Sequence, residues 1–504
     1  MNKKSFLFGA GILTIGALIS RVLGAIYRVP LTRILGAVGM GMYQMVFPIY
    51  ALLIVISTSG MPLAVSKLVA SCQGNIYDKK YIINRSLKGI ILFSLILSAI
   101  LSIFCVKIAK IQGNADLSIS YLSIAPAIIF VGIISVLRGY FQGEQNYTPT
   151  AVSQLVEQGV KIVVGLVLAF ALKRYGIHYS VMGAILGVSV SEIVACFVLI
   201  SQYGRAVRKL DYTNHTTIHT KPNILSTMLP IIMCSIILPI ANMVDSMIVV
   251  NILNKNFSLN YATAMYGIES GAVGAILNLP TVLSFALAST ILPNIASQKD
   301  DSSRQTAITQ ALHINMSIIL PCMLGLVLFA EPIISLLYGN SLDIAGLKGS
   351  MLATSILAVS GIGVLYMSFV QIFTAIMQGE GRGKTAVINL AIAVGVKYLV
   401  QIPLLFMPNV NIYGLVIGNL LCYTTAFILD YTSVRKYVSL SSVSTARIVM
   451  SNILAFAVGV TLYNLLPNIY GFILAFIFIL TIYFSLLFAS KELNYLKIKL
   501  KTHK

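Results

Sequence analysis

The sequence has no tryptophan and few acidic residues, with 15 Asp and Glu against 35 Lys and Arg among its 504 positions. Charged residues make up only 10% of the chain, whereas hydrophobic residues make up 58%. Soluble domains carry about 25% charged residues, so this composition excludes a water-soluble globular protein. The scarcity of charge places most of the chain in an apolar environment.

The sequence also lacks the motifs of common enzymes and metal sites. It contains no Walker A motif, no HExxH, no nucleophile elbow and no GxGxxG after a strand. We therefore expect neither enzyme activity nor a cofactor. Its six cysteines are scattered without a CxxC pair, which excludes a disulfide framework. His215 and His219 have i, i+4 spacing but stand in a polar, threonine-rich segment, which favours a solvated loop over a metal site.

Long hydrophobic runs recur along the whole chain and predict an all-α integral membrane protein. A transmembrane helix needs roughly 20 apolar residues, and these runs are continuous, unlike the alternating strands of a β-barrel. The first run continues to Ile26 without a small-residue cleavage site, so we interpret it as a span rather than a signal peptide. The fourteen predicted spans are about 6–28, 43–71, 86–106, 118–141, 150–172, 179–203, 223–252, 262–296, 306–330, 350–377, 385–407, 411–434, 446–465 and 470–490.

The basic residues gather on one side of these spans. With the N-terminus inside, 23 of the 35 Lys and Arg residues fall at cytoplasmic ends, 8 at outer ends and 4 within spans. This asymmetry follows the positive-inside rule, so the net charge of +20 reflects membrane topology rather than nucleic-acid binding. We expect a multi-pass protein of the cell membrane with both termini in the cytoplasm.

One block of sequence occurs twice. Residues 142–144, 150–152 and 159–161 (QGE, TAV and GVK) return as 378–380, 385–387 and 395–397, at offsets of 236, 235 and 236 residues. Six predicted spans separate the copies, so both halves enter the membrane from the same side and form a parallel internal repeat. Duplicated halves of this kind are typical of transporters.

The repeat and the polar segment after the sixth span define the expected domains. These are an N-terminal six-helix lobe at 1–203, a cytoplasmic linker at 204–222, a second six-helix lobe at 223–434, and two extra helices with a basic tail at 435–504.

The first copy of the repeat also carries a family resemblance. Its motif is RGYFQG…TPTAVSQ…EQ, between residues 138 and 158, and SRVLG at 20–24, GMPLAVSK at 60–67 and ILPNIA at 291–296 agree with the same pattern. On these motifs the chain resembles, over its whole length, the stage V sporulation protein B type of polysaccharide biosynthesis protein. The superfamily includes lipid II flippases and multidrug-extrusion transporters.

The resemblance implies two lobes around a central cavity, alternating access, and a lipid-linked saccharide of the undecaprenyl-pyrophosphate type as cargo. The dedicated lipid II flippases carry cations in their second and eighth spans. Here the middle of span two, 51–58, is uncharged and span eight offers Glu269. The resemblance therefore leaves the particular lipid cargo undefined.

Four cations inside or near the ends of spans are candidate substrate-binding groups. Arg21 and Arg28 are seven residues apart, hence on one face of the first helix. A guanidinium matches a phosphate bidentately, although Arg28 is near enough to the outer surface to snorkel instead. Lys161 and its repeat mate Lys397 lie deep in spans five and eleven, where a charge normally faces a cavity or a partner.

Several carboxylates are candidates for a gate or for coupling to Na⁺ or H⁺. Glu157 stands one turn before Lys161 and forms with it a possible i, i+4 pair, whereas Lys397 has Ala393 at that position. Glu192 lies in the middle of span six. Asp245 and Glu269 lie toward the outer ends of spans seven and eight, where Arg28 is expected to meet them when the lobes close.

Two further charges, Lys67 and Asp430, lie near cytoplasmic helix ends and are expected to snorkel to the surface.

The sequence therefore predicts a flippase that moves a lipid-linked cell-wall or spore-cortex precursor from the inner to the outer leaflet, acting as a monomer. The alternative is an ion-coupled exporter of cationic drugs, which would need unpaired carboxylates in the N-terminal lobe. A membrane scaffold for wall-synthesis enzymes is a third possibility. The cations Arg21, Arg28 and Lys161 favour an anionic cargo.

Overall fold

The computed structural model describes residues 3–72, 76–208, 232, 235–297, 301–435 and 442–490. In this part of the chain twelve helical stretches are long and apolar enough to cross a membrane. One of them, Ile15–Ser71, has 57 residues. At 1.5 Å per residue it spans roughly 85 Å, enough for two crossings of a hydrocarbon core about 30 Å thick. The predicted all-α membrane fold is confirmed.

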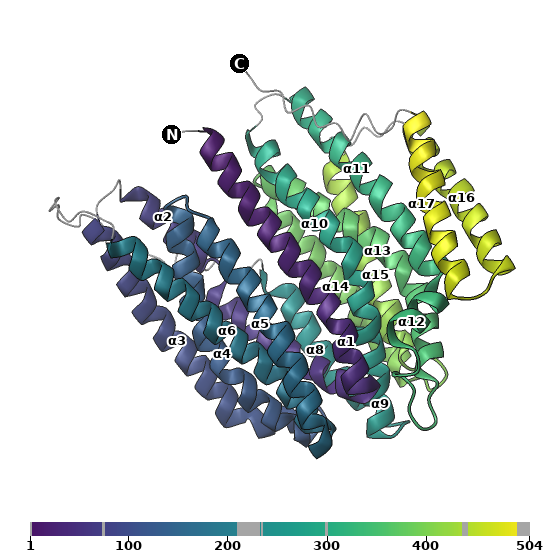
Figure 1. Ribbon diagram of the computed structural model, residues 1–504, viewed down its shortest axis with the longest axis horizontal. Coiled ribbons are helices and arrows are strands. Elements are labelled where there is room, and N and C mark those ends of the chain that lie inside the picture. The colour runs from purple at the N-terminus through teal and green to yellow at the C-terminus, as the bar shows by residue number, and fades with distance from the viewer. Residues whose placement is uncertain are drawn as a thin grey trace. The chain divides into compact units, whose positions relative to one another are not determined.

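Within the described ranges the helices follow one another along the chain (Figure 1). Their bounds are α1 Lys3–Thr58, α2 Met61–Ser71, α3 Ile76–Ile111, η1 Ala115–Leu117, α4 Ser118–Gly143, α5 Thr148–Leu172, η2 Lys173–Tyr175, α6 Ile177–Arg208, α8 Ile237–Leu253, α9 Leu259–Tyr266, η3 Gly267–Val273, α10 Gly274–Ser297, α11 Asp301–Leu328, α12 Ala330–Tyr338, α13 Gly349–Gly379, α14 Gly383–Phe406, α15 Tyr413–Val434, α16 Ser442–Leu465 and α17 Ile469–Ala489.

The chain forms two compact units, Met1–Ala272 and Val273–Lys504. In the first unit α8 and α9 pack against α1, so they group with the first six predicted spans. Residues 204–208 of the expected linker continue α6, and 209–222 lie outside the described residues. The predicted lobe boundaries therefore stay a prediction. In the second unit α16 and α17 pair as the expected C-terminal hairpin.

The first two predicted spans are joined by a kink rather than by a loop. Gly36 has φ 65° and ψ −176°, a conformation that glycine adopts without a steric penalty, and helix continues on both sides of it. The second predicted span is interrupted as well. It stops at Thr58, and the short α2 begins after Gly60, whose φ is 80°. Pro62 stands in the first turn of α2, where its missing N–H leaves no hydrogen bond unmade.

The duplicated QGE motif forms the same turn in both units. Glu144 ends α4 and Glu380 ends α13, each donating its backbone N–H to the carbonyl four residues earlier at 3.0 Å. The next residues, Gln145 and Gly381, both have positive φ, 56° and 75°. A left-handed residue after the helix end is a common way to satisfy the last carbonyls. The repeat in sequence is therefore a repeat in backbone geometry.

The helix that follows each turn packs against its neighbour through glycines. A Cβ on Gly187 of α6 would lie 2.6 Å from the backbone nitrogen of Gly165, and one on Gly418 of α15 would lie 2.8 Å from Cβ of Gln401. Gly165 and Gln401 are again 236 residues apart. Small residues let membrane helices approach closely and gain van der Waals contact. The α5–α6 and α14–α15 pairs thus share one packing geometry.

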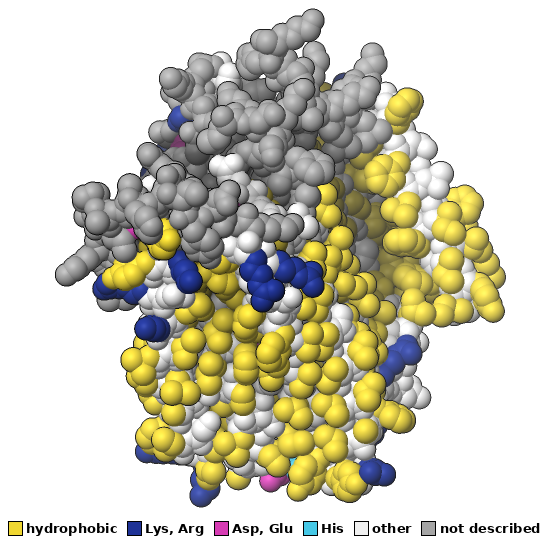
Figure 2. Space-filling model, turned by 60° about the vertical axis from the view of Figure 1, so that its left-hand side comes forward, with side chains coloured by type: hydrophobic (Ala, Val, Ile, Leu, Met, Phe, Trp, Pro, Cys, Tyr) yellow, Lys and Arg dark blue, Asp and Glu magenta, His cyan; other side chains and the backbone are white. Residues whose placement is uncertain are grey.

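Outward-facing side chains are suited to lipid. Helix α3 exposes Leu92, Ile103 and Phe104. Figure 2 shows hydrophobic side chains spread over a broad belt of one face, with Lys and Arg side chains gathered along its margins. Such a distribution fits a hydrocarbon core between two charged membrane surfaces.

The glycine packing predicts a position-dependent effect of a single methyl group. Gly187→Ala should lower the free energy of unfolding by about 1–3 kcal/mol, because the added Cβ would overpack the α5–α6 contact. Gly159→Ala on the exposed face of α5 is the control, since nothing lies within 4 Å of its Cβ position. The chain has no tryptophan, so thermal unfolding would be followed with a fluorescent fusion in detergent. Equal transition midpoints for the two variants would contradict close packing at Gly187.

Candidate functional site

An ion pair joins α4 to α5 in the interior of the first unit. Arg138 donates through Nη2 to Oε2 of Glu157 at 2.9 Å and through Nε to Oγ of Ser153 at 3.1 Å. The side chains of Arg138 and Glu157 are only 18% and 17% exposed. From the sequence Glu157 was expected to pair with Lys161. In the structure Glu157 instead forms its ion pair with Arg138, because the packing of α4 on α5 brings these two residues, 19 positions apart, into contact.

The predicted residues Lys161, Glu157, Glu192 and Arg28 do lie together. The ammonium of Lys161 is 6.0 Å from the centre of the Tyr27 ring and within electrostatic range of the other three charges. Glu192 on α6 is 8% exposed and also feels the charge of Arg138. Three cations and two carboxylates therefore share the region between α1, α4, α5 and α6. With three cations against two carboxylates, the cluster carries one net positive charge when all five groups are ionised.

Helix α1 presents its two arginines beside α5. A Cβ on Gly24 would lie 3.3 Å from the side-chain oxygen of Gln158, so the two helices are in direct contact here. Arg28 is partly buried, whereas Arg21 is exposed. Arg21 lies fifteen residues before the Gly36 kink, or about 22 Å along the helix. An exposed guanidinium at such depth needs water or an anion rather than alkyl chains around it.

Two predicted carboxylates, Asp245 of α8 and Glu269 of η3, are buried. Both lie within electrostatic range of the hydroxyl group of Tyr266. Glu269 accepts a hydrogen bond from the Ser270 hydroxyl at 2.6 Å, and Gln44 of α1 donates to the Ser270 carbonyl. Element η3 is a π-helix of seven residues. Such wide turns frequently mark functional positions in membrane and soluble proteins. The expected meeting of Arg28 with these two carboxylates stays a prediction.

The second unit carries a buried polar face on α14. Asn389, Lys397 and Gln401 lie on it, with Lys397 only 4% exposed and its ammonium 5.4 Å from the Tyr398 ring. Asp430 of α15 faces this side and receives a hydrogen bond from Asn389 Nδ2 at 2.9 Å. The expectation that Asp430 snorkels is wrong, since it is 2% exposed. Lys67, in contrast, is exposed.

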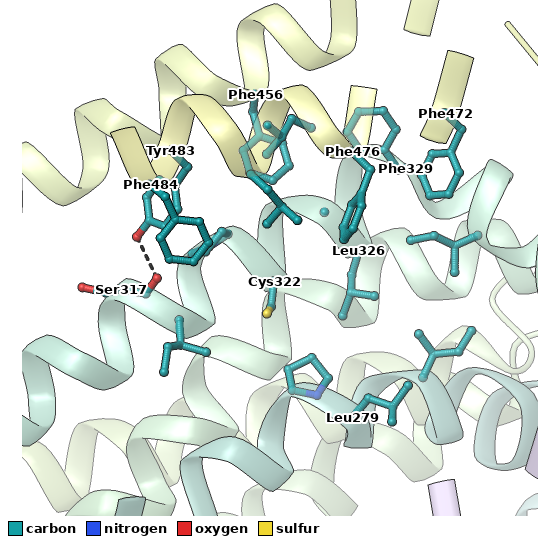
Figure 3. Close-up of a pocket in the computed structure, with 18 of the residues that line it drawn as sticks. Leu279, Ser317, Cys322, Leu326, Phe329, Phe456, Phe472, Phe476, Tyr483 and Phe484 are labelled. Atoms are coloured by element: carbon teal, nitrogen blue, oxygen red, sulfur yellow. Dashed lines mark hydrogen bonds between the residues drawn. The ribbon is translucent and has the colours of Figure 1, made fainter. Parts of the chain in front are cut away.

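An apolar cavity of about 470 Å³ also lies in the second unit. Figure 3 shows Phe456, Phe476 and Phe484 of the C-terminal hairpin facing Cys322 and Leu326 of α11. One end is tied by a hydrogen bond from the Tyr483 hydroxyl to the Ser317 carbonyl, 2.7 Å long. The lining is almost wholly hydrocarbon and aromatic, so the cavity suits an alkyl or isoprenoid chain. Sequence reasoning missed it, because a lipid-facing stripe and a cavity wall have the same composition.

Metal binding has no structural support in the described part of the chain. No group of three His, Cys, Asp or Glu side chains there has the arrangement of a metal site. His215 and His219 lie outside the described residues.

The two repeated lysines differ in accessibility, which predicts different chemical reactivity. In a variant without the six native cysteines, Lys161→Cys should react with a water-soluble thiol reagent, because Lys161 is partly exposed beside Arg28. Lys397→Cys, at the matching depth, should be protected because its position is buried. Mass spectrometry of labelled membranes would measure both. Labelling of the two cysteines at equal rates would contradict this difference.

The fold and these buried charges define a multi-pass membrane protein with the architecture of a transporter. The family described as polysaccharide biosynthesis protein matches residues 6–299. The chain belongs to this family.

The curated relatives include the lipid II flippase MurJ of Bacillus subtilis (strain 168), 24% identical over 506 residues that cover 94% of this chain and 91% of the relative. They also include stage V sporulation protein B of the same organism, 28% identical over 360 residues that cover 68% of each.

Solved structures agree on the fold. A lipid II flippase MurJ in an inward closed conformation matches with a TM-score of 0.75 at 17% identity, covering 95% of this chain and 99% of that one. An inward-facing multidrug resistance MATE family transporter matches with a TM-score of 0.63 at 17% identity, covering 83% and 95%.

Proposed function

We propose that this protein is a flippase that moves a lipid-linked cell-wall or spore-cortex precursor from the inner to the outer leaflet by alternating access. The observation that carries the proposal is the group of cations Arg21, Arg28 and Lys161 at the contact of α1 and α5. The named functions of the relatives, lipid II flipping and sporulation, support the same cargo class. The protein acts by binding and movement rather than by covalent chemistry.

The cations suit the pyrophosphate of an undecaprenyl-pyrophosphate-linked saccharide. Arg21 is exposed, and a guanidinium makes two parallel hydrogen bonds to phosphate oxygens. Arg28 lies two turns further along the same face of α1, and Lys161, which feels the charge of Arg28, adds a third positive charge. Considered by itself, the apolar cavity of the second unit suits part of the polyprenyl chain.

The alternative, a multidrug exporter, needs a free carboxylate for a cationic drug. In the first unit Glu157 is taken by Arg138, which disfavours that alternative. We infer that both termini are cytoplasmic, from the positive-inside distribution of charge, that the protein works as a monomer, and that an Na⁺ or H⁺ gradient drives transport. Glu192, Asp245 and Glu269 remain the sequence-based candidates for the gate or the coupling ion.

Replacing Arg21 tests the anion site. Arg21→Ala should abolish complementation of a strain lacking its own flippase, and Arg21→Lys should restore it only partly, since an ammonium lacks the planar fork. Arg174→Ala is the matched control, because Arg174 is an exposed cation that stacks on Tyr175. Immunoblots of membranes would show equal amounts of the variants. Full activity of Arg21→Ala would contradict the anion-site proposal and favour a role as a membrane scaffold for wall-synthesis enzymes.

Filling the apolar cavity tests the lipid part of the proposal. Gly325 lines the cavity, and the nearest atom to its Cβ position, in Phe456, is 4.0 Å away. Gly325→Leu should therefore be tolerated by the helix while occupying part of the cavity. We expect less polyprenyl lipid to co-purify with this variant in mild detergent, as measured by lipid mass spectrometry. Gly395→Leu, at an open position of α14, is the control, and equal lipid content in both would argue against a chain in this cavity.

A further inference from the structure

The buried carboxylate of Asp430 has no role in the function proposed above. Asp430 lies on the inner face of α15, in line with Cys422 and Ala426 at four-residue spacing, and this face packs on α14. Asn389 Nδ2 donates to Asp430 Oδ1 at 2.9 Å and lies 3.4 Å from the Ser433 hydroxyl. The carboxyl is thus held by neutral groups only.

The charged side chains at the end of α13 and the start of α14 are matched with one another. At the start of α14, Arg382 donates through Nη1 to the Ser433 carbonyl at 3.0 Å, and its charge is met by Glu380 of the α13 end at 3.6 Å. Lys397 is the other charge on the buried face of α14, eight residues beyond Asn389 and so about 12 Å along the helix. In the described residues no cation forms an ion pair with Asp430.

The remaining neighbours bring no charge that would neutralise the carboxylate. Helix α13 contributes the Phe373 ring, which packs against Tyr431 of α15. The Ser433 hydroxyl donates to the Leu429 carbonyl within α15. An ionised carboxylate in such surroundings carries a large desolvation penalty, whereas a protonated one does not. The equivalent region of the first unit avoids this penalty through the Arg138–Glu157 pair.

We propose that Asp430, held by Asn389, is the site at which one proton binds and couples an H⁺ gradient to transport. This inference rests on the proposed transport function and adds the coupling ion to it. A protonated Asp430 becomes a hydrogen-bond donor, and the Asn389 amide nitrogen cannot accept from it. The carbonyl oxygen of the protonated carboxyl still accepts from Asn389 Nδ2, while the new hydroxyl on its other oxygen needs an acceptor among the neighbouring groups. Proton binding thereby changes the contact between α14 and α15.

The proton rather than a metal ion is the occupant that the geometry favours. Among the described residues, Asp430, Asn389 and Ser433 bring four side-chain oxygens here, two of them from the carboxylate, and the amide directs its NH₂ group at Asp430 and Ser433. A hard metal cation takes six or more oxygen ligands. A single proton needs one acceptor and one partner.

The full-length protein in proteoliposomes separates coupling from cargo movement. A labelled polyprenyl-pyrophosphate-linked saccharide would be followed in two assays, exchange between leaflets without a gradient and accumulation under a pH gradient. For one proton per cargo, a gradient of one pH unit should raise wild-type accumulation by up to about tenfold. Asp430→Asn should keep exchange and lose this stimulation, because the near-isosteric amide preserves the contact with Asn389 but cannot ionise.

The control variant is Asp343→Asn, which alters an exposed carboxylate that caps Ser350. It should retain both exchange and stimulation. A measurement without cargo is infrared spectroscopy of the protein in lipid. One component of the protonated-carboxyl band should appear as the pH falls in the wild type, be missing from the Asp430→Asn difference spectrum, and titrate at another pH in Asn389→Ala.

The outcomes distinguish the two proposals. Retained gradient stimulation in Asp430→Asn, an unchanged infrared titration, or stimulation that follows Na⁺ at constant pH would overturn the coupling site while leaving the flippase intact. Absence of exchange by the wild type would overturn the cargo, and the infrared titration would still decide whether Asp430 takes up a proton.

Discussion

The structure depends on one constraint: the interior of a bilayer solvates neither a backbone amide nor a charge. The backbone satisfies its own hydrogen bonds by forming helices in the membrane-spanning part. The helices are interrupted at positions such as Gly36 and Gly60, where glycine permits the turn. The side-chain answer is that charges occur in groups. Arg138 and Glu157 pair, and Lys161, Glu192 and Arg28 surround them.

The two units solve the same constraint with the same packing and different charges. Both use an identical turn after the QGE motif and glycines that press α6 on α5 and α15 on α14. In the first unit the helices so joined carry a matched ion pair. In the second, Ala393 and Thr374 stand at the positions of Glu157 and Arg138, 236 residues on. The lysine remains, and Asp430 appears on the other helix. The repeated helix packing is thus combined with different charges in the two units. This difference is suited to a transporter in which one unit binds the substrate and the other couples transport to an ion.

Much of the fold was predictable from sequence. Membrane spans are recognised as continuous apolar segments, and the internal repeat is recognised by motifs that recur at a fixed offset. The same reasoning failed wherever the answer depended on which helices touch. Glu157 looked like the partner of Lys161 and Asp430 like a snorkelling charge, because the residues they contact, Arg138 and Asn389, lie 19 and 41 residues away on other helices. The RGYFQG motif, which contains Arg138, was the sequence feature that marked this region as distinctive. The apolar cavity beneath the C-terminal hairpin gave none, since its aromatic lining has the composition of a lipid-facing surface.

The glycine contacts have a consequence for descent. A position whose missing Cβ lets a neighbouring helix approach closely, such as Gly187 or Gly418, can be substituted only at a cost in helix packing. A buried charge, in contrast, can be exchanged together with its partner. Over long divergence after a duplication, the contacts that hold the scaffold should therefore change slowly and those that choose the ligand should change fast. Distant relatives with other cargoes would then be recognised by where their helices touch rather than by what their cavities hold.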